Sequence, residues 1–259
     1  MNVKSELLKP GLEVASLSDV GCQRENNEDS VLYWEPVAAE LESKGRLAVI
    51  ADGMGGYEGG QEASRLAVET VREVYDNVVG DDPHVALLEA FSRAHERIQA
   101  YAVAHPELHG MGTTCTALVI RGRKLYFAHV GDSRLYLVRG AHIARLTRDH
   151  SYVGRLVESG IVRAEDAEKH PQRHILTAAL GAGIEFAMQT GEQGLALQAS
   201  DDLLLCTDGL WGVVSDQELE TAVNGKTPAE CCATLVKLAL RRGGPDNITV
   251  QILRVLPEP

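Results

Sequence analysis

The sequence predicts an α+β domain built in layers, with strands and helices grouped apart from each other. Two observations lead to this prediction: short apolar or alternating runs typical of strands occur in clusters, and pairs of amphipathic helices follow them. The chain has 259 residues, of which 44% are hydrophobic and 24% charged, a composition that can form a sizeable core. It contains no repeat, low-complexity block or linker, so we expect a single domain over residues 1–259.

The N-terminal half predicts three strands and then two helices. The strand patterns cover residues 12–17, 31–34 and 47–51. One helical stripe runs from Ala63 to Val78, and a second helix begins at Asp82 and Pro83, which suit an N-cap and a first helical position. Two long amphipathic helices are therefore adjacent in the sequence.

The rest of the chain predicts more strands, an insertion and a second pair of helices. A predicted antiparallel meander, with tight Gly-containing connections, covers residues 115–120, 124–130, 134–138 and 142–146. Residues 147–183 have weaker patterns, with short helical pieces rich in His and Arg, and indicate an irregular insertion. A strand at 202–206 follows, then helices opened by capping boxes at Ser215 and Thr227, then a strand at 248–255.

Charge and composition exclude several functions. Asp and Glu total 37 against 25 Lys and Arg, and the net charge of −12 disfavours nucleic acid and anionic membrane surfaces as partners. No apolar run approaches the roughly 18 residues of a membrane span, and the N-terminus lacks the apolar stretch of a secretion signal, so we expect a cytoplasmic protein. The five cysteines include no Cys-x-x-Cys pair and indicate neither a disulfide framework nor a zinc site.

Aspartates at the ends of predicted strands are the most informative feature. Asp52 follows an apolar strand and precedes Gly53, and Asp208 follows another such strand. Asp132 occupies a Gly-Asp-Ser turn, and Asp246 precedes the last strand. Each of them alone fits an ordinary turn residue. If the two central strands lie side by side, however, their ends carry the carboxylates into one crevice.

Several carboxylates in one crevice repel one another unless cations neutralise them. Oxygen ligands without His or Cys favour Mg²⁺ or Mn²⁺, and Gly53 can turn sharply and present a carbonyl. The nearby loop 21–29 adds Arg24, Glu28 and Asp29. Alone it fits a solvated polar loop, but an arginine beside such a cation pair could bind phosphate oxygens.

Five blocks carry these residues in a fixed order: Ser18–Ser30, Ala51–Gly56, Val130–Arg134, Cys206–Gly212 and Gly244–Asn247. Together, over residues 12–255, the sequence resembles the metal-dependent Ser/Thr protein phosphatase family, type 2C, in its compact bacterial form. The resemblance implies a four-layer αββα sandwich of two antiparallel sheets flanked by helix pairs. It also implies that the insertion at residues 147–183 is a flap beside the cleft.

The resemblance also assigns roles to individual residues. It implies two core Mn²⁺ or Mg²⁺ ions and a third ion. Asp52 would bridge the two core ions, with the Gly53 carbonyl, Asp208 and Asp246 completing the first site and Glu28 and Asp29 the second. Asp132 with Asp208 would support the third ion, Asn247 would support the site, and Arg24 would grip the substrate phosphate.

The implied reaction is direct hydrolysis of phosphoserine and phosphothreonine monoesters by a hydroxide between two ions, without a phosphoenzyme. The implied partners are phosphorylated proteins, including kinases and their substrates, and the implied state is a monomer. Animal members have a histidine acid where this chain has Met54, so water or a flap histidine such as His150, His170 or His174 could protonate the leaving group. The alternative function is a catalytically silent module that binds phosphoproteins; a two-metal nuclease is disfavoured by the acidic charge.

Overall fold

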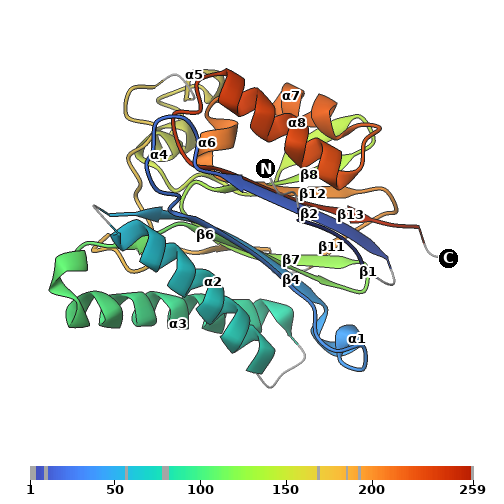
Figure 1. Cartoon of the computed structure of the whole chain (residues 1–259), viewed down its shortest axis with the longest axis horizontal. Helices are drawn as coiled ribbons and strands as arrows, with labels where there is room; N and C mark the ends of the chain where they lie inside the picture. The colour runs from blue at the N-terminus through green and yellow to red at the C-terminus, as the bar shows by residue number, and fades with distance from the viewer. Residues whose placement is uncertain are drawn as a thin grey trace.

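The computed structural model describes residues 4–8, 11–55, 58–77, 82–167, 170–184, 186–191 and 194–257. Two antiparallel sheets lie face to face, and helices cover the outer side of each (Figure 1). This arrangement confirms the four-layer αββα sandwich. None of the helices in these ranges is long and apolar enough to cross a bilayer.

The first sheet has six strands in the order β1-β2-β13-β12-β8-β9. They are β1 (Lys4–Leu8), β2 (Leu12–Asp19), β8 (Arg134–Arg139), β9 (His142–Arg145), β12 (Asp202–Cys206) and β13 (Ile248–Val255). The helices on its outer face are α6 (Asp208–Trp211), α7 (Asp216–Val223) and α8 (Pro228–Arg241). The capping boxes predicted at Ser215 and Thr227 are present and begin α7 and α8.

The second sheet has seven strands, in the order β10-β7-β6-β4-β3 with β11 beside β7 and β5 beside β4. They are β3 (Asp29–Trp34), β4 (Arg46–Met54), β5 (Gly112–Thr113), β6 (Cys115–Arg121), β7 (Lys124–Val130), β10 (Gln189–Thr190) and β11 (Leu195–Ala196). Two helices, α2 (Gly59–Asn77) and α3 (Pro83–Ala104), cover it. Asp82 caps α3, as predicted, by accepting a hydrogen bond from the His84 amide. Val78, the predicted end of the first helical stripe, lies outside the described residues.

Short elements connect these layers. They are α1 (Leu41–Lys44), a 3₁₀ helix (Pro106–Leu108), α4 (Tyr152–Glu158) and α5 (Ala164–Ala167). The last two are the short helical pieces predicted within residues 147–183. This segment is joined to the rest of the fold by the backbone pairing of Leu180 with Thr113.

Apolar side chains fill three separate layers, one between the sheets and one beneath each helix pair. The alternation in β12 explains this arrangement, because successive side chains of a strand point to opposite faces. Leu203 and Leu205 face the layer between the sheets, whereas Leu204 and Cys206 face α8 and its neighbours. Both faces of the central strands are therefore buried, which holds the ends of these strands in place.

The predicted four-strand meander is wrong at its middle connection. β6 pairs with β7 in the second sheet, and β8 pairs with β9 in the first, so the chain changes sheet at residues 131–133. Gly131 has a φ of +107°, and a Cβ there would lie 2.5 Å from Thr114, so glycine is required. Local alternation cannot show whether a tight turn joins two neighbours or crosses between sheets.

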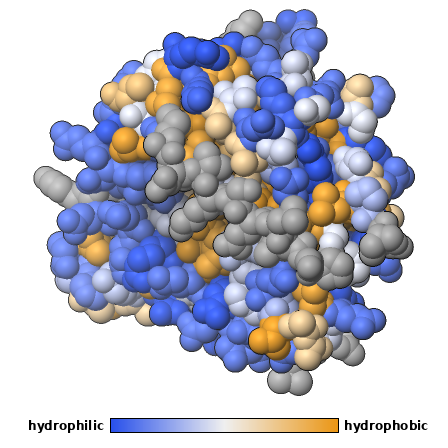
Figure 2. Space-filling view, turned by 45° about the vertical axis from the view of Figure 1, so that its right-hand side comes forward, coloured by the Kyte–Doolittle hydropathy of each residue, from blue (hydrophilic) through white to orange (hydrophobic). Residues whose placement is uncertain are grey.

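On the face seen in Figure 2, hydrophilic residues predominate among those described, and apolar ones lie between them. Large exposed apolar side chains are spread along the chain, among them Val37, Val103 and Ile161. Single exposed apolar residues of this kind are normal on folded proteins.

Leu204 tests the layer beneath α8. Its side chain is fully buried, so Leu204→Ala should lower the free energy of unfolding by about 2–5 kcal/mol through lost burial and a cavity. The control Leu195→Ala alters a side chain that is 41% exposed and should cost below about 1 kcal/mol. Urea denaturation of both variants checks this, and equal losses would contradict the assigned packing.

Candidate metal and phosphate site

One cleft, with a volume of about 1230 Å³, brings most of the predicted site residues together. Its lining includes Arg24, Glu28, Asp52, Gly53, Asp132, Asp208 and Asp246. Asp29 and Asn247 are the predicted site residues outside that lining. Both of them form hydrogen bonds with residues around the cleft.

The two central strands do not lie side by side, which was the condition that the sequence analysis set for a common crevice. β4 belongs to the second sheet and β12 to the first, so Asp52 and Asp208 reach the cleft from opposite sheets. The prediction of a common crevice depended only on the strand ends meeting. Face-to-face packing of two sheets meets that condition as well as strand pairing does.

Asp52 is held by its backbone at the end of β4. Its amide donates to Thr114 Oγ1 at 2.9 Å, and its carbonyl accepts from Thr113 Oγ1 at 2.8 Å. The Gly53 amide donates to the Glu28 carbonyl at 3.1 Å. A Cβ on Gly53 would lie 2.0 Å from the Gly60 carbonyl, so only glycine allows α2 to begin so close to the site.

Asn247 fastens the loop that carries Arg24 and Glu28. Its side-chain amide donates to the carbonyls of Val20 and Asn26, both at 2.9 Å, and its Oδ1 accepts from the Glu28 amide at 2.8 Å. Asn247 is only 5% exposed, so these bonds are costly to lose. They agree with the role that the resemblance implies for Asn247, which is to hold the residues of the site in place.

Asp132 is connected to α6, the helix that Asp208 begins. Its backbone carbonyl accepts from Trp211 Nε1 at 2.9 Å. The Arg134 guanidinium lies 3.6 Å from the centroid of the Trp211 ring and forms an ion pair with Asp149. This packing places the Asp132 turn beside Asp208, the pair predicted for a third ion.

The carboxylates interact strongly in the cleft. Burial raises the pKa of Asp52 well above its usual range, and the neighbouring Asp29, Asp208 and Asp132 carboxylates raise it further. Burial and the Asp208 carboxylate likewise raise the pKa of Asp132, and burial raises the pKa of Glu28. Because buried negative charges destabilise one another, such a group needs a positive partner.

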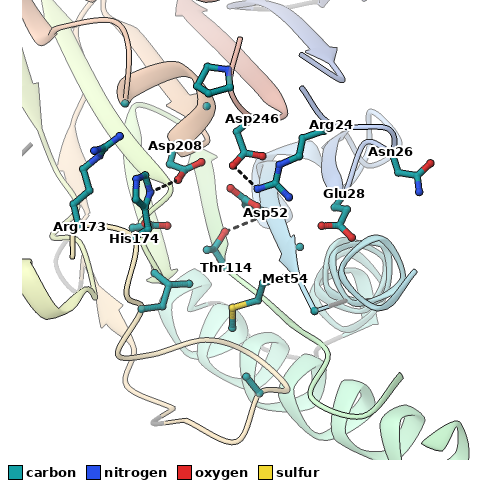
Figure 3. A pocket seen from close by; sticks show the side chains of 18 of the residues that line it. Arg24, Asn26, Glu28, Asp52, Met54, Thr114, Arg173, His174, Asp208 and Asp246 are labelled. Carbon is teal, nitrogen blue, oxygen red and sulfur yellow. Dashed lines mark hydrogen bonds and ion pairs between the residues drawn. The ribbon is translucent and has the colours of Figure 1, made fainter. Parts of the chain in front are cut away.

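Arg24 is one positive partner. Its Nη2 donates to Asp246 Oδ2 at 2.8 Å, and half of its side chain is exposed. Figure 3 shows Arg24 and Glu28 on one side of Asp52 and Asp246, and His174 beside Asp208 on the other side. An exposed guanidinium at a carboxylate cluster can also reach an incoming phosphate.

The donor set fits hard cations. The buried Asp29 Oδ1 has no hydrogen-bond partner in the structure, and every charged group of the predicted set except Arg24 is a carboxylate. Among the described residues, no three His, Cys, Asp or Glu side chains are close enough to hold an ion by themselves. Mg²⁺ and Mn²⁺ keep several water ligands in sites of this type, which is compatible with that spacing.

The cleft also contains residues that the sequence did not assign to the site. Thr114 and Arg173 line it (Figure 3). Met54, which the resemblance relates to the histidine of animal members, lines it too. Thr114 belongs to a Gly-Thr-Thr segment that lies between two of the five blocks of the sequence. Arg173, in contrast, has no feature in the sequence that marks it as a site residue, apart from its charge. Its contribution depends on where the flap folds, which local patterns do not report.

The flap histidines differ in position. His174 lines the cleft, with Nδ1 at 3.6 Å from Asp208 Oδ2. His150 Nδ1 instead accepts from the Gly131 amide at 3.2 Å. Neither His150 nor His170 belongs to the described lining of the cleft. His174 is therefore the flap histidine that reaches the site.

Comparison with known proteins gives consistent results. Residues 23–236 match the family described as protein phosphatase 2C. The chain is 38% identical over 246 residues to the serine/threonine protein phosphatase PstP of Mycobacterium tuberculosis, covering 95% of this chain but only 45% of that protein. It is 35% identical over 250 residues to the protein phosphatase PhpP of Streptococcus pneumoniae, covering 95% and 99% of the two chains.

Solved structures show the same fold. The catalytic domain of PstP, in complex with two manganese ions, has a TM-score of 0.81 at 36% identity and covers 95% of this chain and 99% of that one. A serine/threonine phosphatase from Staphylococcus aureus has a TM-score of 0.85 at 30% identity, covering 99% and 100%. With the ordered acidic motifs and the profile match over most of the sequence, these similarities show that the chain belongs to the protein phosphatase 2C family.

Proposed function

We propose that this protein hydrolyses phosphoserine and phosphothreonine monoesters on proteins, in a reaction that depends on divalent cations. The observation that carries this proposal is the meeting of Asp52, Asp208 and Asp246 in one cleft, from opposite sheets, beside the exposed guanidinium of Arg24. The names of the relatives support the same activity. Kinases and their phosphorylated targets are the expected class of substrate.

The family resemblance implies the cation ligands, and the meeting of most of them in one cleft supports that assignment. Asp52, Asp208, Asp246 and the Gly53 carbonyl would hold one ion, and Asp52 with Glu28 and Asp29 would hold the other. Asp132 and Asp208 would hold a third. Bound Mn²⁺ or Mg²⁺ would lower the pKa of a coordinated water and neutralise charge on the phosphoryl oxygens.

Water is the nucleophile that the cleft favours. Its described lining contains no serine or cysteine. The hydroxyl of its one lining threonine, Thr114, accepts from the Asp52 amide and is hydrogen-bonded to Ser133 at 2.8 Å. A side chain held in this way is a poor nucleophile, so these contacts disfavour a phosphoenzyme on a hydroxyl or thiol group and agree with the direct hydrolysis that the family resemblance implies.

Arg24 orients the substrate phosphate. Its side chain is half exposed and points to the carboxylates from a loop fastened by Asn247. Two parallel N–H donors match two phosphate oxygens. Met54, on the cleft wall, has no proton to donate, so another group must protonate the leaving alkoxide.

The test of the activity uses p-nitrophenyl phosphate and a phosphothreonine peptide, with Mn²⁺ and with chelator. Asp208→Asn should lower kcat by roughly a hundredfold or more, because a charged group that acts on the reacting centre is lost. The control Asp76→Asn removes an α2 carboxylate that pairs with Lys44 and should retain activity. Full activity in chelator would contradict the proposal, whereas phosphopeptide binding without turnover would support the silent module instead.

Arg24→Ala should chiefly raise KM for the phosphopeptide, by roughly tenfold, because a charge-assisted pair of hydrogen bonds to phosphate is lost. Arg24→Lys keeps the charge without the planar fork and should fall between wild type and Arg24→Ala. Arg97→Ala, which breaks an exposed ion pair between Arg97 on α3 and Glu73 on α2, is the matched control. An unchanged KM in Arg24→Ala would refute the phosphate role.

A further inference from the structure

Two buried threonines join the sheets at the cleft through one carboxylate oxygen. Thr207 Oγ1 donates to Asp29 Oδ2 at 2.9 Å, and Thr249 Oγ1 donates to the same oxygen at 2.6 Å. Asp29 begins β3 of the second sheet, whereas Thr207 follows β12 and Thr249 lies in β13, both of the first. Thr207 and Thr249 are both 0% exposed, so no water competes for these bonds.

The hydroxyl protons are ordered by their surroundings. Thr249 gives its one hydroxyl proton to Asp29, so its contact with Ser18 Oγ at 2.7 Å requires Ser18 to donate. Ser18 in turn accepts from Asn27 Nδ2 at 2.8 Å. Thr207 Oγ1 accepts from the Thr249 amide at 3.1 Å, which leaves its proton for Asp29. Both hydroxyls are therefore set as donors to the same oxygen.

The other carboxylate oxygen of Asp29, Oδ1, accepts neither of these hydrogen bonds. Oδ1 is buried and has no hydrogen-bond partner in the structure, a costly condition for a carboxylate oxygen. Asp29 lies opposite Asp52 in the register of β3 and β4. One oxygen is thus fixed by two hydroxyls, and the other remains available beside the carboxylate cluster.

The two threonines are close in sequence to two of the cleft aspartates. Thr207 directly precedes Asp208, and Thr249 is three residues after Asp246. The bonds to Asp29 therefore connect the strand pair that carries Asp52 with the segments that carry Asp208 and Asp246. A carboxylate ligand is commonly oriented by hydrogen bonds of this kind, and their loss weakens cation binding.

We propose that Thr207 and Thr249 are positioning residues for the cation site: their hydroxyls hold one oxygen of Asp29, set the spacing between the two sheets at the cleft, and turn the other oxygen toward the ions. This inference rests on the proposed function, because it takes the carboxylate cluster as the cation site. The inference attributes the positioning of Asp29, and with it the affinity for cations, to the threonine hydroxyl groups and not to the volume of the side chains.

Isosteric variants separate the hydroxyl from the volume. In Thr207→Val and Thr249→Val, calorimetric titration of chelator-stripped protein should show Mn²⁺ binding weakened by roughly tenfold or more. Thr207→Ser and Thr249→Ser keep the donor and should bind Mn²⁺ close to wild type. The control Thr70→Val removes another buried hydroxyl, one that donates to the Leu66 carbonyl in α2, and should leave Mn²⁺ affinity unchanged.

The outcomes distinguish this inference from the proposed function. A wild-type protein without Mn²⁺-dependent phosphatase activity overturns the function and this inference with it. An active wild type whose Val and Ser variants bind Mn²⁺ equally well overturns the inference alone. If the Val variants do not fold, Thr207→Ala and Thr249→Ala carry the test, because each also removes a hydroxyl that donates to Asp29. Mn²⁺ binding by these Ala variants as tight as by the Ser variants overturns the inference.

Discussion

Repulsion among carboxylates that two sheets bring to one point is the constraint on which the site depends. Asp52, Asp132 and Glu28 all have raised pKa values because each is removed from water, and the aspartates repel their neighbours. A fold gains nothing by this arrangement unless positive charge offsets it. The guanidinium of Arg24 offsets part of it, and divalent cations suit the remaining oxygens. The repulsion that makes the carboxylate cluster costly for the fold is therefore also what makes the cluster suited to bind cations.

The sandwich supplies the rigidity that such a cluster needs. Central strands buried on both faces, as in β12 with Leu203 and Leu204 on opposite sides, cannot shift without opening an apolar layer. Polar contacts then connect the strand ends: Asn247 fastens the loop of Glu28, and Trp211 holds the Asp132 turn. The apolar layers fix the position of the sheets, and the polar contacts fix the direction of the ligands.

The cleft combines residues of the family motifs with residues of the flap, the segment 147–183. The flap brings His174 within 3.6 Å of Asp208 and contributes Arg173 to the wall of the cleft. Met54 also lines the cleft, and its thioether has no proton to donate. The flap therefore adds to the cleft side chains that the strand-end motifs do not contain.

The sequence by itself determined the longer helices α2, α3, α7 and α8, most of the strands and the acidic residues of the cleft, because periodicity, capping boxes and Asp-Gly strand ends are local signals. Tertiary structure alone decided that the chain crosses between sheets at Gly131, that Asp52 and Asp208 approach from opposite sheets, and that Thr207 and Thr249 share one oxygen of Asp29. A strand's pattern shows which faces are buried but not which strand or sheet covers them. Contacts between distant segments follow from the packing of the whole chain.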